Sequence, residues 1–205
     1  MLTELRIAGF GGQGVILAAH IIGNAVALHE KGFATMTQNY GPEARGGAAS
    51  AALVLSDEPI LYPYLTQPDI LVAMSLEAYT KFAPEVKEGG FLLVEEELVQ
   101  LDALAKIPHC RIYGIPATRF AEELGKKMVL NVIMVGFFCA ITKAVSPEAC
   151  RVGVEHEVPK RFLDLNLKAF NKGYEYGLEL LTHQGERTHP GEEMVAGLEL
   201  DGQAK

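Results

Sequence analysis

The stretch LRIAGFGGQGV, residues 5–15, begins the fold of this chain of 205 residues. Its first four residues form a short apolar run that is typical of a buried strand, and a cluster of glycines follows. Apolar residues then recur at helical spacing over residues 15–29, and a second apolar run covers residues 33–37. A strand, a glycine turn, a helix and a strand in this order predict a βαβ unit.

Strands and helices alternate beyond this unit and then give way to helices alone. Apolar runs predict further strands at residues 48–56, 70–74, 91–95 and 111–115. Helical spacing predicts helices at residues 75–83, 116–125, 130–143, 147–156 and 159–182, with Ser75 and Ser146 as N-caps. We therefore expect an α/β fold: a Rossmann-like sheet with flanking helices and a helical carboxyl-terminal part. Residues 1–182 should form a single Rossmann-like domain, and residues 183–205 a tail that is flexible or ordered by a partner.

The composition excludes several classes of function. The formal net charge of −8 argues against binding to nucleic acid, which requires a basic surface. Cys110, Cys139 and Cys150 lie far apart with no CxxC pair, so they predict neither an iron–sulfur cluster nor a structural zinc site. We interpret them as small buried residues of a cytoplasmic protein. The longest uncharged run, residues 128–142, is shorter than the ~20 residues that span a bilayer, and it predicts a buried helix without membrane contact.

The glycine cluster fits the pattern GxGxxG through Gly9, Gly11 and Gly14, with an additional glycine at position 12. The first glycine permits a tight turn, the second lets a ligand approach the backbone, and the third lets helix and strand pack closely. Free amides at the start of the following helix favour an anion, because the helix dipole adds to them. A nicotinamide or flavin dinucleotide would also require an acidic residue near the end of the second strand, and residues 35–39 contain none. The missing acid argues against a dinucleotide, and two interpretations are favoured over it: the turn binds a phosphate or pyrophosphate of another ligand, or it serves only backbone packing or subunit contact.

A second loop, NYGPEARGG at residues 39–47, follows the second predicted strand. It combines the phenol of Tyr40, the carboxylate of Glu43 and the guanidinium of Arg45 with shape-restricting glycines and a proline. Because it follows a strand, we expect it at the same carboxyl edge of the sheet as the glycine turn, where open α/β sheets bind ligands. Arg45 is suited to a phosphate or carboxylate, and equally to an ion pair with Glu43 across a subunit interface.

No catalytic constellation is present in the sequence, and we expect no catalytic or metal-ligating residue in this chain. The patterns HExxH, GxSxG and GxxxxGK[ST] do not occur. Asn131, which opens an apolar helix, is either a residue of the N-cap region or a polar group that faces the cleft, and we favour a capping or packing role.

The two loops together carry a family resemblance. GFGGQGV at residues 9–15 and NYGPEARGG at residues 39–47 resemble the gamma subunits of 2-oxoacid:ferredoxin oxidoreductases. The similarity continues in PDILVA at residues 68–73, NVIMVG at residues 131–136 and NLKAF at residues 166–170, so that it covers about residues 3–180.

This resemblance implies an enzyme complex that oxidatively decarboxylates a 2-oxoacid and passes the electrons to ferredoxin, forming an acyl-CoA and CO2. It also implies that thiamine diphosphate, Mg and the iron–sulfur clusters are held by the partner alpha, beta and, where present, delta subunits, and that ferredoxin contacts the complex elsewhere. The chain is most similar to the 2-oxoglutarate type, with the branched-chain 2-oxoacid and pyruvate types next. No activity is expected from this chain alone.

The gamma-type domain of the family lies over the active site and assists coenzyme A binding, and coenzyme A contains a pyrophosphate. The resulting candidate contacts are Gly9, Gly11, Gly12, Gln13, Gly14, Tyr40, Gly41, Glu43, Arg45 and Gly46. Two alternatives stand beside this hypothesis: a free-standing nucleotide-binding oxidoreductase, and a purely structural module of an assembly.

Overall fold

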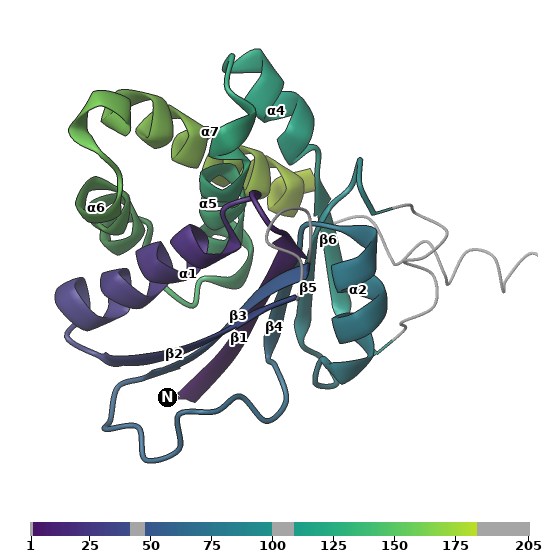
Figure 1. Ribbon diagram of the computed structural model, residues 1–205, viewed down its shortest axis with the longest axis vertical. Coiled ribbons are helices and arrows are strands. Elements are labelled where there is room, and N and C mark those ends of the chain that lie inside the picture. Colours follow the sequence, from purple (N-terminus) through teal and green to yellow (C-terminus); the bar gives the residue numbers. More distant parts are fainter. Residues whose placement is uncertain (1, 42–47, 100–108, 184–205) are drawn as a thin grey trace, which may run out of the picture.

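The computed structural model describes residues 2–41, 48–99 and 109–183, which form a six-stranded sheet with helices on both faces (Figure 1). The strands are β1 (Leu2–Phe10), β2 (Phe33–Tyr40), β3 (Ala48–Ser56), β4 (Ile70–Ala73), β5 (Phe91–Glu95) and β6 (Arg111–Ile115). The helices are α1 (Val15–Asn24), α2 (Leu76–Phe82), α4 (Ala117–Glu123), α5 (Leu130–Thr142), α6 (Pro147–Glu157) and α7 (Leu163–His183). Short helical turns are η1 (Ala25–His29), η2 (Ala83–Glu85), η3 (Lys127–Val129) and η4 (Lys160–Phe162). The predicted α/β fold with a helical carboxyl-terminal part is confirmed.

The order of the strands is β2-β3-β1-β4-β5-β6. β4 pairs parallel to β1, and β5 and β6 continue the parallel arrangement. β3 pairs antiparallel to both β1 and β2, so β1 and β2 run in the same direction without being neighbours. The predicted βαβ unit therefore needs one correction: α1 crosses over an inserted antiparallel strand. The inserted strand reaches this place because β2 turns back into β3 as a hairpin.

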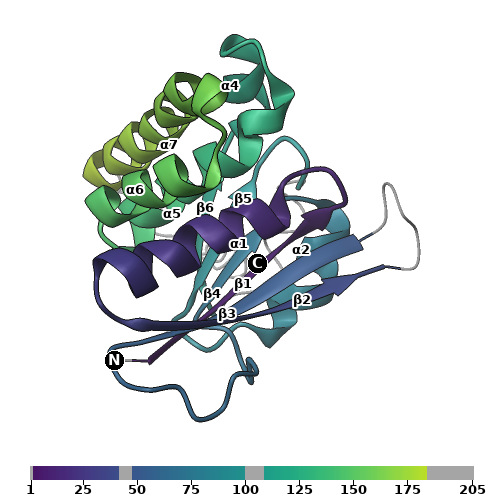
Figure 2. The same cartoon turned by 60° about the vertical axis from the view of Figure 1, so that its left-hand side comes forward.

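The two faces of the sheet have separate apolar cores. The larger core joins one set of alternating strand residues to α1, α4, α5, α6 and α7, and the smaller core joins the opposite set to α2 (Figure 2). Ile7 and Val72 belong to the larger core, whereas their sequence neighbours Ala8 and Leu71 belong to the smaller one. Because β4 is covered on both faces, its sequence is continuously apolar.

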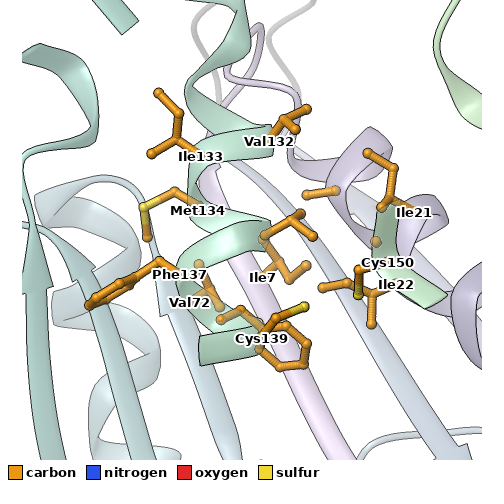
Figure 3. Packing of buried hydrophobic residues seen from close by; sticks show 14 of the residues in the cluster. Ile7, Ile21, Ile22, Val72, Val132, Ile133, Met134, Phe137, Cys139 and Cys150 are labelled. Carbon is orange, nitrogen blue, oxygen red and sulfur yellow. The ribbon is translucent and has the colours of Figure 1, made fainter. Parts of the chain in front are cut away.

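Helix α5 lies at the centre of the larger core. Every residue from Leu130 to Ile141 is buried, which confirms the buried helix predicted from the uncharged run. Figure 3 shows Val132, Ile133 and Phe137 of this helix among side chains of the sheet and of α1. None of the helices in the described ranges is both long and apolar enough to cross a bilayer.

Local signals placed several details correctly. The Ser75 hydroxyl oxygen accepts a hydrogen bond from the Ala78 amide at 3.1 Å, and the Ser146 hydroxyl oxygen accepts one from the Ala149 amide at 3.3 Å, so both predicted N-caps are confirmed. All three cysteines are buried, as the interpretation as small core residues required. Helix α7 ends at His183, and residues 184–205 of the predicted tail lie outside the described residues. The division into a domain of residues 1–182 and a tail stays a prediction.

Candidate functional site

The glycine turn leaves the carboxyl end of β1, and Gln13 closes it. The Gln13 amide donates to the Phe10 carbonyl at 3.1 Å, and the Gln13 Oε1 accepts from the Phe10 amide at 2.6 Å. The Nε2 of the same side chain donates to the carbonyl of Met74 at 2.8 Å, just beyond the end of β4. The Gln13 side chain therefore links the carboxyl ends of β1 and β4. Both the oxygen and the nitrogen of its amide group form hydrogen bonds with the backbone of this chain.

Two glycines of the turn have the left-handed backbone that glycine adopts without strain: φ is 99° at Gly12 and 76° at Gly14. Gly14 directly precedes α1, and no side chain of the described residues caps this end of the helix. Helix amides that lack an internal partner are suited to an anion.

Asn131 fills the space beside Gly14. Its Nδ2 donates to the Gly14 carbonyl at 3.2 Å, and the residue is 1% exposed. Its Oδ1 is buried without a hydrogen-bond partner among the described residues. The structure therefore agrees with the interpretation of Asn131 as a packing residue. Asn131 packs against Gly14 of the glycine turn.

The second loop begins and ends at the same edge of the sheet as the glycine turn. β2 extends to Tyr40, beyond its predicted end at residue 37, because pairing with β3 continues as far as Tyr40 opposite Ala49. The Gly41 amide donates to the Ala48 carbonyl at 2.7 Å and closes the base of the loop. The predicted residues Glu43, Arg45 and Gly46 lie outside the described residues.

A cavity of about 370 Å³ lies between α2 and the ends of β1, β2 and β3. It brings together three of the predicted site residues, Gly9, Tyr40 and Gly41. The other predicted residues of the turn, Gly11, Gly12, Gln13 and Gly14, are not part of its wall. The wall is completed by Arg6, Asn39, Ala48, Ala49, Ser50, Ser75, Glu77, Ala78, Lys81 and Phe82.

Sequence reasoning missed the charged residues of this wall. Arg6 lies in the middle of β1, with its guanidinium carbon 4.4 Å from the centre of the Phe82 ring and an ion pair to Glu85 at 3.3 Å. Burial lowers the pKa of the Arg6 guanidinium, and Glu85 acts in the opposite direction. The Arg6 Nε is buried and has no hydrogen-bond partner among the described residues. An arginine inside the apolar run LRIA was the signal available in the sequence.

No group of three or more histidine, cysteine, aspartate or glutamate side chains is arranged to hold a metal ion within residues 2–41, 48–99 and 109–183. The site thus combines two cationic side chains, the carboxylate of Glu77 and neutral hydrogen-bonding groups at the carboxyl edge of a sheet. Open α/β sheets commonly bind their ligands at this edge.

Comparisons with known proteins place this domain in a family. A model of the family described as pyruvate ferredoxin/flavodoxin oxidoreductase matches residues 4–176. The 2-oxoglutarate synthase subunit KorC of Methanocaldococcus jannaschii is 46% identical over 181 residues, which cover 88% of this chain and 96% of the relative.

Two solved structures share the fold. The gamma subunit of a keto/oxoacid ferredoxin oxidoreductase from Geobacter sulfurreducens is 36% identical with a TM-score of 0.74, covering 86% of this chain and 99% of its own. A 2-oxoglutarate:ferredoxin oxidoreductase from Magnetococcus marinus, with 2-oxoglutarate, coenzyme A and succinyl-CoA bound, is 23% identical with a TM-score of 0.76. The match covers 86% of this chain and 31% of that longer chain. At this identity it shows a shared fold and nothing further.

The chain belongs to the pyruvate ferredoxin/flavodoxin oxidoreductase family. The resemblance to gamma-type subunits of 2-oxoacid:ferredoxin oxidoreductases, drawn from the two loops, is confirmed.

Proposed function

We propose that this chain is the gamma-type subunit of an oxidoreductase that converts 2-oxoglutarate to succinyl-CoA and CO2 with ferredoxin as electron acceptor. The high identity to an archaeal protein named as a subunit of 2-oxoglutarate synthase supports this substrate. The partners are the alpha, beta and, where present, delta subunits, which hold thiamine diphosphate, Mg and the iron–sulfur clusters. Three buried thiols suit a reducing cytoplasm, where we place the complex.

Within this complex the chain covers the active site and contributes to the binding of coenzyme A. The observation that carries this step is that Gly9, where the glycine turn begins, and both ends of the second loop meet at one cavity: Gly9, Gly41 and Ala48 all line it. Backbone amides at the start of α1 are suited to a pyrophosphate. The bound coenzyme A of the Magnetococcus marinus enzyme supports this choice of ligand.

We assign the backbone of Gly9, Gly11, Gly12, Gly14, Gly41 and Gly46 to contact with coenzyme A. Arg45 supplies a guanidinium for a phosphate, and Tyr40 and Glu43 complete the loop around it. Gln13 acts indirectly, because its side chain holds the turn in shape.

The test is to purify the complex from its native cell through this chain and measure steady-state kinetics of the reconstituted enzyme. We expect thiamine- and cluster-bearing partners to co-purify, and the KM for coenzyme A to rise about tenfold in Arg45→Ala, since a charge-assisted hydrogen bond contributes about 1.5 kcal/mol. Arg161→Ala, which removes a guanidinium from the helical part of the chain, is the matched control.

Three results would speak for the alternatives. Recovery of the chain without any large partner, together with binding of a nicotinamide or flavin nucleotide, would favour a free-standing oxidoreductase. Loss of assembly in Arg45→Ala, or an unchanged KM for coenzyme A in an intact complex, would favour a purely structural module.

A further inference from the structure

Two cationic side chains, those of Arg6 and Lys81, line the cavity beside the glycine turn. We propose that Arg6 and Lys81 bind a phosphate monoester dianion in this cavity; the inference rests on the proposed function, under which the group is the 3′-phosphate of coenzyme A. Both residues line the cavity together with the carboxylate of Glu77, and Glu85 pairs with Arg6 from outside the wall. The phosphate site therefore depends on the position of the two cations and not on the net charge around the cavity.

The cationic groups of Arg6 and Lys81 both lie near the Phe82 ring. The guanidinium carbon of Arg6 lies 4.4 Å from the ring centre, and the Lys81 Nζ lies 5.1 Å from it. Phe82 is 9% exposed and belongs to the core under α2, so its position is well determined by packing. Both cations thus lie beside one ring of fixed position, and an anionic group that contacts both is attracted by both charges.

Arg6 is built into the site more firmly than a surface arginine. The Arg6 side chain is only 15% exposed. Its Nη2 atom forms an ion pair with the Glu85 Oε2 atom at 3.3 Å. The ring and this ion pair together restrict the planar guanidinium, which matches the geometry of a phosphate. Lys81, at the last turn of α2, is exposed and supplies a second charge from the rim.

Neutral groups complete a phosphate site. Ser50 and Asn39 face each other across the β2–β3 pairing and both line the cavity. The Ser75 oxygen accepts from the Ala78 amide, which leaves its hydroxyl hydrogen to donate. Gly9 lines the same cavity at the start of the glycine turn, so the site adjoins the amides to which we assign the pyrophosphate. A ligand with a pyrophosphate and a separate phosphate monoester therefore matches both the glycine-turn amides and the cavity.

The experiment compares coenzyme A with dephospho-coenzyme A, which lacks only the 3′-phosphate, in the assembled complex. We expect the wild type to prefer coenzyme A, and Lys81→Gln to raise the KM for coenzyme A about tenfold while the KM for dephospho-coenzyme A changes less than twofold. Arg6→Lys keeps the positive charge but removes the planar guanidinium and its contact with the Phe82 ring. It should reduce the preference for coenzyme A over dephospho-coenzyme A to a smaller extent. Lys168→Gln, an exposed lysine on α7, is the control for a simple loss of charge.

An unchanged preference for coenzyme A in both variants, or an equal rise of both KM values, would overturn the phosphate site. These results are separate from a failure of the proposed function. If Arg45→Ala leaves the KM for coenzyme A unchanged while Lys81→Gln abolishes the preference, the second loop loses its role and the phosphate site stands.

Discussion

Two glycines of the turn after β1 are required for different physical reasons. Gly12 has φ of 99° with open space where a side chain would begin, so only the backbone conformation favours glycine there. Gly14 has φ of 76°, and a methyl group on it would also come 2.5 Å from the Nδ2 of Asn131. The side chain of Asn131 thus occupies the place that any residue other than glycine would need.

We predict that Gly14→Ala destabilises the protein more than Gly12→Ala. The Gly12 substitution should cost about 1 kcal/mol of unfolding free energy, because a left-handed conformation is unfavourable for alanine. The Gly14 substitution adds a clash and should cost about 3 kcal/mol. Urea unfolding of the purified variants measures both values. The double variant Gly14→Ala/Asn131→Ala should regain part of the loss, and equal losses in the two single variants would contradict this assignment of Asn131.

Among the elements, helices α5 and α7 approach each other closely through glycines. A methyl group on Gly136 would collide with the backbone carbonyl of Phe170, and one on Gly173 would collide with the carbonyl of Ile133. Each helix thus presents a glycine to the backbone of the other, which brings the two helices into direct backbone contact. This pair of glycines lets α7 complete the cover over the larger core.

We predict that Gly173→Ala lowers the free energy of unfolding by about 3 kcal/mol or more, because neither backbone can move away without opening the core. Gly23→Ala in α1 is the matched control, since its new methyl group would meet its nearest neighbour, the Leu53 Cδ2, at 3.5 Å. This control should be neutral or gain about 0.5–1 kcal/mol from the higher helix propensity of alanine. Thermal and urea unfolding of the two variants decide the matter, and a mild effect of Gly173→Ala would refute the close approach of the helices.

For the molecule as a whole, a buried carboxylate fastens the long connection between β3 and β4 to the sheet. Glu4 is 4% exposed and accepts hydrogen bonds from the Thr66 hydroxyl at 2.7 Å and from the amides of Thr66 and Gln67 at 3.0 Å. The Lys87 ammonium lies 3.3 Å from the same carboxylate and 2.8 Å from Asp69. Burial raises the pKa of Glu4, but these hydrogen bonds and the cation outweigh it and hold the pKa below its ordinary value.

A lowered pKa in the folded state makes Glu4 a source of acid sensitivity. Its contribution to stability is complete above the unfolded pKa of about 4.3 and disappears as the pH falls through the lower folded pKa. We expect Glu4→Gln to lose about 2 kcal/mol of unfolding free energy at pH 7, because an amide nitrogen then faces the Gln67 amide. The difference from wild type should shrink below about pH 4. Urea unfolding between pH 3 and pH 7 measures this, with Glu88→Gln as an exposed control, and a constant difference would disprove the role of the charge.

Features with short-range signals were predictable from residue order alone. The strands and helices were placed by the period of their apolar residues, and Ser75 and Ser146 by the local chemistry of helix starts. The glycine turn was recognisable because a strand, a turn and a helix follow one another directly. The position of the two loops at one edge also followed from local order, because both leave strands that point the same way.

The three-dimensional fold alone placed β3 between β1 and β2, since hairpin pairing and a crossover helix leave the order of strands open. It also brought Arg6, Lys81 and Phe82 to one cavity and put Asn131 against Gly14. Arg6 is far from Lys81 and Phe82 along the chain, and Asn131 is far from Gly14, so these contacts depend on which faces of the distant elements are buried together. Local periodicity indicates that a face is buried, but only the packing of distant elements determines what it is buried against.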